Sequence, residues 1–86
     1  MKTISFTKAA WADYIHWVNS DQKKLKKINS LIEEITRTPF EGTGQPEPLK
    51  YRLSGFWSRR IDKENRLVYT VETDKVEIIS CKGHYS

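Results

Sequence analysis

The chain has 86 residues, 37% of them hydrophobic and 12% aromatic, and its 15 basic and 11 acidic side chains give a formal net charge of +4. This length suits one domain over 1–86, and the aromatic content excludes a fully disordered chain. No apolar run approaches the roughly 18 residues of a membrane-spanning helix. The N-terminus also lacks a secretory signal, and the lone Cys81 excludes an internal disulfide, so we expect a cytoplasmic protein. The basic balance favours a polyanionic partner, nucleic acid first.

The N-terminal half predicts a short strand followed by two helices. Ile4 and Phe6 indicate the strand, and Thr7 is a residue type that caps helices. Apolar residues then recur at helical spacing in two stripes, separated by a second potential cap at 19–21. The stripes are Trp11, Tyr14, Ile15 and Val18, then Leu25, Ile28, Ile32 and Ile35. The second helix should end before Pro39, because proline disfavours helix in the residue before it, which gives two antiparallel helices joined by a tight turn.

The C-terminal half predicts strands. Residues 38–55 contain all three prolines and three of the four glycines, which indicates an ordered loop or a strand entry. Three runs rich in β-branched and aromatic residues follow at 56–61, 66–71 and 76–81, and polar turns separate them. Such runs predict an antiparallel meander. The expected fold class is α+β, with the two helices packed on one face of a twisted, mainly antiparallel sheet.

The second helix carries the first of two basic clusters. Lys23, Lys26 and Lys27 lie opposite its apolar stripe, whereas Lys24 falls within the stripe and must extend its ammonium out of it. The helix dipole disfavours cations at this N-terminal end. The cluster is therefore either a solvated helix face or a contact to a phosphate backbone.

The second basic cluster comes from the predicted strands. Its members are Lys50, Arg52, Arg59, Arg60, Arg66, Lys82 and His84. They form either a charged sheet surface or a set of cations that bracket a phosphate and bind RNA. Alternation along a strand places Arg60 with Ser58 on one face and Arg59 with Trp57 on the other.

Glu47 and His84 add acid–base chemistry to these cations. Cleavage of RNA by internal attack needs a base for the 2′-hydroxyl, an acid for the leaving 5′-oxygen and a cation for the phosphoryl oxygens. Glu47, His84 and an arginine would meet those needs without a metal or other cofactor. The histidines and Cys81 show no metal-ligand spacing, and Cys81 is expected in the core. These patterns leave open whether the acid, base and cation converge.

Several motifs occur in one order along the chain. They are RTPFEG at 37–42, GQPEPLK at 44–50, GFWSRRI at 55–61, NRLVY at 65–69 and the closing His84-Tyr85, with an early WADY at 11–14. This set resembles the YoeB/Txe family of bacterial toxins within the RelE superfamily. The resemblance implies a microbial-ribonuclease-like fold and an endoribonuclease that cuts mRNA in the ribosomal A site. The expected ends are a 2′,3′-cyclic phosphate or 3′-phosphate and a 5′-hydroxyl.

The resemblance also assigns residue roles and partners. It puts Glu47 at the general-base position, His84 at the general-acid position and Arg66 on the arginine that stabilises the transition state. The supporting positions are Lys50, Arg60 and Tyr85. The implied partners are the ribosome, mRNA and a YefM/Axe-like antitoxin, and a homodimer agrees with the family. Here Ser86 follows the usual terminal His-Tyr pair, which moves the terminal carboxylate away from Tyr85.

Two other functions compete with this interpretation. One is a non-catalytic RNA- or ribosome-binding module that uses the same basic surface. The other is a gyrase-directed toxin on the same superfamily fold. The joint occurrence of Glu47, Arg66 and His84 favours the nuclease.

Overall fold

The computed structural model describes residues 2–83 and has the predicted α+β class. Its elements in chain order are β1 (Thr3–Phe6), α1 (Lys8–Ser20), α2 (Gln22–Arg37), β2 (Glu47–Pro48), a 3₁₀ turn (Tyr51–Leu53), β3 (Trp57–Arg60), β4 (Arg66–Val71) and β5 (Lys75–Ser80). Both predicted helices are confirmed, and β4 has the predicted bounds. Strands β3 and β5 differ from the predicted runs by one residue at each end.

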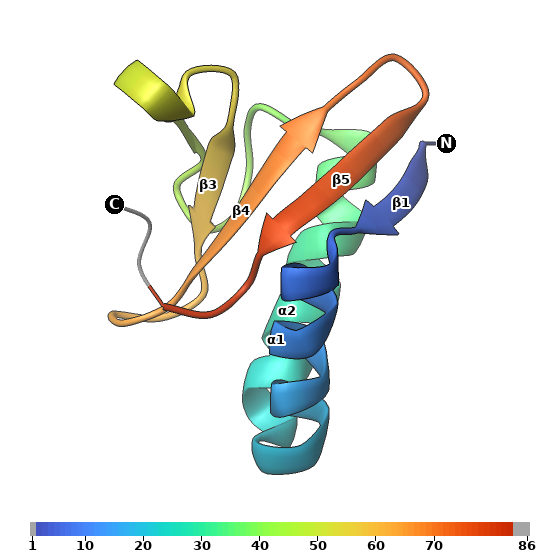
Figure 1. Ribbon diagram of the computed structural model, residues 1–86, viewed down its shortest axis with the longest axis vertical. Helices are drawn as coiled ribbons and strands as arrows, with labels where there is room; N and C mark the ends of the chain where they lie inside the picture. The colour runs from blue at the N-terminus through green and yellow to red at the C-terminus, as the bar shows by residue number, and fades with distance from the viewer. Residues whose placement is uncertain (1, 84–86) are drawn as a thin grey trace.

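The strands form one five-stranded sheet in the order β1-β5-β4-β3-β2 (Figure 1). The predicted antiparallel meander is confirmed for β3, β4 and β5, and β2 extends it antiparallel to β3. Strand β1 pairs in parallel with β5 at one edge of the sheet, and α1 and α2 connect it to β2 at the opposite edge. The register shifts between Val68 and Tyr69, where β4 and β5 form a bulge.

The two helices begin at side-chain caps that the sequence predicted. Thr7 Oγ1 accepts a hydrogen bond of 3.0 Å from the Ala10 amide, and Asp21 Oδ1 accepts from the amides of Lys23 and Lys24 at 3.1 Å each. Asp21 is also the only residue between the two helices. Its own amide donates to the Trp17 carbonyl at the end of α1, so the same residue caps the end of α1 and the start of α2. Within residues 2–83, no helix is long and apolar enough to cross a membrane.

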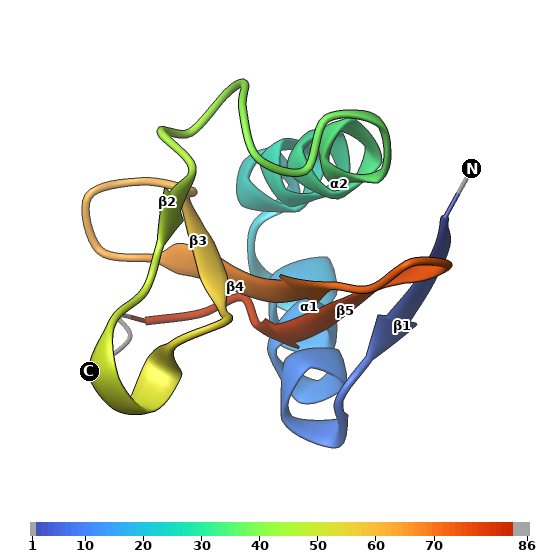
Figure 2. The ribbon, with the colours of Figure 1, turned by 90° about the horizontal axis from the view of Figure 1, so that it is seen from above.

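The core lies between α2 and the sheet. Figure 2 shows the sheet nearly edge-on, with α2 along one side and the 3₁₀ turn projecting at the far end from the helices. The buried side chains of α2 are Ile28, Leu31, Ile32, Ile35 and Thr36. They belong to the same layer as Leu67 and Tyr69 of β4 and Val76 and Ile78 of β5. Cys81 is fully buried there, as predicted, and burial raises the pKa of its thiol to about 12.

Of the stripe predicted as the packed face of α1, only Tyr14 packs against the core. Trp11 is 52% exposed, and Ile15 and Val18 are also exposed, whereas Ala10 and Trp17 are buried. The packed face is turned by about one residue, because Trp17 inserts between the helices and the sheet and its indole Nε1 donates to the Cys81 carbonyl at 2.8 Å. Trp11 instead stacks on Tyr14 at the surface.

Candidate functional site

The candidate site lies on the sheet face that points away from α2. In the observed register, Glu47 of β2 pairs with Ser58 of β3, and Arg60 of β3 pairs with Arg66 of β4. Paired residues and residues two apart share a face, so these four side chains lie on one surface. The helix-facing side of the same strands carries Leu67 and Tyr69. The alternation read from the sequence, with Arg60 beside Ser58, is confirmed.

Arg66 and Glu47 form the centre of this surface. The Arg66 guanidinium Nη1 lies 3.3 Å from Glu47 Oε1 and donates to Ser58 Oγ at 3.2 Å. The Arg66 side chain is 18% exposed and that of Glu47 is 46% exposed. A largely enclosed cation therefore lies next to an accessible carboxylate. Such a pair can hold an anionic oxygen while accepting a proton from a neighbouring hydroxyl.

Arg59 faces the opposite way and was wrongly grouped with the surface cations. Its side chain is fully buried, and all five of its N–H donors are used. Nε donates to Tyr69 Oη at 3.2 Å, and one Nη1 bond goes to Glu34 Oε1 at 2.5 Å. The other three bonds go to the carbonyls of Thr38, Glu41 and Thr43. The signal was in the sequence, because alternation puts Arg59 on the apolar face.

Glu34 completes this buried cluster from α2. It accepts from the Thr43 amide at 2.6 Å and from Thr43 Oγ1 at 3.1 Å, and it pairs with Arg59. These contacts, the Thr43 amide first, lower the pKa of the Glu34 carboxyl from its usual value although partial burial opposes this. The helix dipole by itself disfavours a carboxylate this close to the C-terminal end of α2, and the contacts to Thr43 and Arg59 offset that cost. The structure shows that Glu34 fastens a loop.

The fastened loop, residues 38–46, leads directly into Glu47. Tyr69 Oη donates to the Pro39 carbonyl at 2.7 Å, and the Arg60 amide donates to the Gly44 carbonyl at 2.7 Å. Gly42 has a φ of +124°, and a Cβ there would collide with the Glu34 carboxylate. Since the loop is bonded along its length, β2 enters the sheet at a fixed register and Glu47 is set opposite Ser58.

The C-terminal end of the described chain reaches the same site. The Arg66 amide donates to the Gly83 carbonyl at 2.9 Å, and the Gly83 amide donates to Asn65 Oδ1 at 2.8 Å. His84 and Tyr85, the predicted acid and its neighbour, lie outside the described residues together with Ser86. The residue before them is thus anchored beside Arg66.

A short network supports this anchor. Asn65 Nδ2 donates to the Asp62 carboxylate at 3.1 Å, and Lys24 of α2 lies 2.8 Å from Asp62 Oδ2. Partial burial disfavours the charged form of Asp62, but the hydrogen bonds from Lys24 and from the turn outweigh it and hold the pKa of the carboxyl well below its usual range. Lys24 therefore leaves the apolar stripe, as the sequence required, to reach the turn between β3 and β4.

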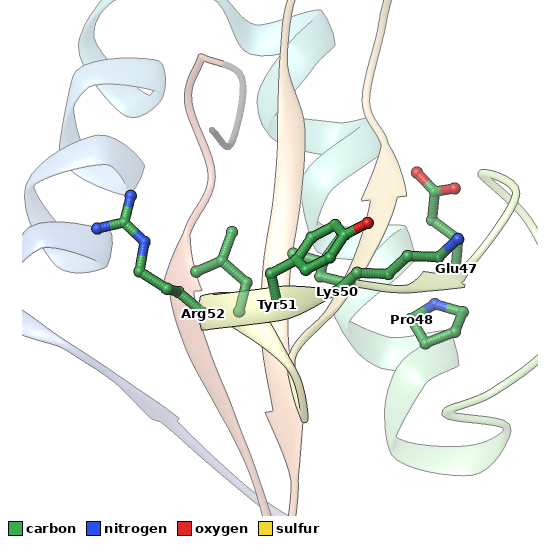
Figure 3. Close-up of a pocket in the computed structure, with 7 residues that line it drawn as sticks. Glu47, Pro48, Lys50, Tyr51 and Arg52 are labelled. Carbon is green, nitrogen blue, oxygen red and sulfur yellow. The ribbon is translucent and has the colours of Figure 1, made fainter.

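Of the other predicted cations, Lys50 and Arg60 lie beside this centre, whereas the lysines of α2 lie apart from it. Lys50 and Arg60 are exposed, and Lys50 lines a pocket of about 430 Å³ together with Glu47 (Figure 3). Lys23 and Lys26 are exposed at the start of α2, and Lys27 is half-buried there. Lys23, Lys26 and Lys27 do not line the pocket. Lys24, which lies among them in the sequence, instead pairs with Asp62 in the turn between β3 and β4. Tyr51, which no sequence pattern singled out, also lines the pocket and is 91% exposed.

Comparisons with known proteins give one consistent result. Residues 6–85 match the model of the YoeB-like toxin of bacterial type II toxin-antitoxin systems. The toxin YoeB of Escherichia coli K12 is 54% identical over 85 residues, which cover 99% of this chain and 100% of that protein.

Two solved structures from Staphylococcus aureus superpose closely. A YoeB dimer is 47% identical with a TM-score of 0.91, covering 98% of each chain. A YoeB–YefM complex is 45% identical with a TM-score of 0.90, covering 99% of each chain. The chain therefore belongs to the family of YoeB-like toxins of bacterial type II toxin–antitoxin systems.

Proposed function

We propose that this toxin is a ribosome-dependent endoribonuclease that cleaves mRNA in the A site and so inhibits translation. The observation that carries the proposal is the 3.3 Å approach of Arg66 Nη1 to Glu47 Oε1 on an accessible sheet face. A phosphate held by this guanidinium would place the adjoining ribose within reach of the carboxylate. Membership of the YoeB-like family supports the same activity.

Cleavage would proceed by internal attack. The 2′-hydroxyl oxygen forms a bond to the adjacent phosphorus and loses its proton to Glu47. The bond from phosphorus to the 5′-oxygen breaks, and His84 protonates this leaving oxygen. Arg66 stabilises the charge that builds on the non-bridging oxygens. The products are a 2′,3′-cyclic phosphate, which water can open to a 3′-phosphate, and a 5′-hydroxyl.

The other site residues would support this reaction. Exposed Lys50 follows Glu47 closely in the chain, and exposed Arg60 pairs with Arg66 across β3 and β4. From these positions both cations can neutralise phosphates of the bound RNA strand. Tyr85 would shape the site beside His84. Arg59 acts at a distance, since its bonds to the 38–46 loop fix the position of Glu47. The reaction needs no metal or cofactor, because protein groups supply acid, base and cation.

The proposed partners follow from the family and the charge. A YefM-like antitoxin is supported by the YoeB–YefM complex, and a homodimer is supported by the YoeB dimer. The ribosome and mRNA match a surface with net positive charge. The proposed location is the cytoplasm, because a toxin that acts on ribosomes must be in the compartment that contains them.

The test is to map RNA ends in a translation reaction with and without the protein. Cuts confined to codons in the A site are expected. Replacing His84 by alanine should slow single-turnover cleavage about 10²- to 10⁴-fold while ribosome binding persists. Binding without cuts would indicate a non-catalytic module, and arrest of DNA supercoiling without cuts would indicate a gyrase-directed toxin.

A further inference from the structure

Tyr51 has a conformation and an exposure that packing does not explain. Its side chain is 91% exposed, and its backbone φ is +60°. Few residues other than glycine, asparagine and aspartate occupy this left-handed region, because the Cβ crowds the backbone. A side chain that contacts so little protein cannot compensate for this strain in the folded chain. Strained residues of this kind concentrate at ligand sites.

The loop around Tyr51 holds this conformation in place. At its base, the amide of buried Leu49 donates to the Phe56 carbonyl at 2.8 Å. Within the turn, the Ser54 amide donates to the Tyr51 carbonyl at 3.0 Å, and the Leu53 amide donates to the Lys50 carbonyl at 3.1 Å. The ring is therefore presented to solvent from a hydrogen-bonded turn.

The surroundings of the ring are cationic and belong to the catalytic face. Exposed Lys50 and Arg52 flank Tyr51 in the chain, and all three line the pocket of about 430 Å³ that begins at Glu47. Figure 3 shows the ring directed along the loop, with its hydroxyl towards the end of the pocket where Glu47 lies. An exposed aromatic ring flanked by cations is an arrangement by which proteins bind single-stranded nucleic acid, since bases stack on the ring and the cations bind the phosphates.

We propose that Tyr51 is a stacking platform for one unpaired base of the mRNA, beside the phosphate that is cleaved. Lys50 and Arg52 bind the phosphates on either side of that base. This inference rests on the proposed nuclease function and adds a base-binding subsite to it. Stacking uses the flat face common to all bases, so the subsite holds the strand without selecting a sequence.

The test is a double-mutant cycle between the side chain and the base. Single-turnover cleavage is measured on ribosomes whose A-site codon, or the nucleotide beside it, carries one abasic residue at a time. Tyr51→Leu keeps an apolar side chain but lacks the aromatic face, and it should slow cleavage of the intact mRNA about 10-fold or more. Tyr51→Phe keeps the ring and should recover most of that loss. At the position whose base stacks on Tyr51, the abasic residue removes the interaction, so the unmodified protein and Tyr51→Leu should cleave that mRNA at equal rates.

Tyr51→Gly separates a functional role from a structural one. Glycine relieves the left-handed conformation, so the melting temperature should not fall, while cleavage should slow as much as in Tyr51→Leu. A structural tyrosine would lower both together. The stacking proposal is overturned if the effect of Tyr51→Leu is the same at every abasic position as on intact mRNA. Cleavage that fails in the unmodified protein would instead overturn the nuclease function on which the proposal rests.

Discussion

Arg59 and Arg66 occupy neighbouring strands and face opposite sides of the same sheet. Arg59 points towards the helices, is fully buried, and spends all five donors on Glu34, Tyr69 and loop carbonyls. Arg66 points away from the helices and lies 3.3 Å from the half-exposed Glu47. Burial with complete pairing makes Arg59 part of the fold, whereas Arg66 lies beside an accessible carboxylate, where the proposed chemistry requires a cation.

The largest expected effect comes from removing the buried arginine. Arg59→Ala removes the cation that pairs with the Glu34 carboxylate and the donor to three loop carbonyls, and such a loss should cost about 3–5 kcal/mol in the free energy of unfolding. Urea unfolding measures it. Arg60→Ala is the matched control, since this neighbouring side chain is exposed and its loss should cost under about 0.5 kcal/mol. Equal stabilities for the two variants would contradict the structural role of Arg59.

The next effect is on catalysis at the other arginine. Arg66→Ala should slow cleavage about 10²-fold or more at saturating toxin, because a donor aimed at the transition state is lost. Arg66→Lys should recover only part, since an ammonium keeps the charge without the planar fork. Single-turnover cleavage on ribosomes measures both. Full recovery by lysine, or a defect cured by more toxin, would show that Arg66 only supplies charge for binding.

The elements of the fold were predictable because their signals are local. Thr7 and Asp21 are residue types that cap helices, and Thr7, Asp21 and the proline after α2 set helix bounds within a residue or two. The β-branched and aromatic residues over 66–71 indicated the strand, and alternation along it assigned side chains to its two faces. The packed face of α1 was not predictable in this way. Trp11 and Trp17 are equally apolar in the sequence, and only contact with β5 decides which is buried.

The site was predictable in its residues but not in its contacts. Glu47 and Arg66 were selected from the sequence, whereas their pairing requires β3 to lie between β2 and β4. The Arg59–Glu34 pair joins residues 25 positions apart, so no local pattern reveals it. The left-handed backbone of Tyr51 is equally hidden, because its side chain type gives no indication of positive φ. Residue types therefore identified candidate residues, whereas the contacts between them depend on the arrangement of strands and loops that are distant in the sequence.

Acid should weaken the buried cluster through Glu34. Its pKa is lower in the folded chain than the usual value, so protonation favours the unfolded state. The stabilisation is complete above about pH 5 and is lost as the pH falls through the folded pKa. Urea unfolding between neutral and acid pH should show this loss, and Glu34→Gln should reduce it, while Asp62, whose pKa is also lowered in the folded chain, accounts for acid sensitivity that remains. Glu33→Gln alters an exposed carboxylate and should leave the profile unchanged. Parallel profiles for Glu34→Gln and the unmodified protein would contradict the assignment.

The smallest expected effect concerns the lysines at the start of α2, far from both arginines in the chain. The first turn of α2 contains no acidic residue, and Asp21 alone caps it. Replacing Lys23, Lys26 and Lys27 with glutamine removes cations from the positive end of the helix dipole, so stability should stay level or rise slightly.

If these lysines contact ribosomal RNA, binding should weaken, and the slope of log affinity against log salt should become shallower by up to about one unit per lost phosphate contact. Cleavage by prebound toxin should persist, because the three side chains do not line the pocket at Glu47. Ribosome binding across a salt series measures the slope. An unchanged slope would assign these lysines to a solvated helix face and leave RNA contacts to the sheet cations alone.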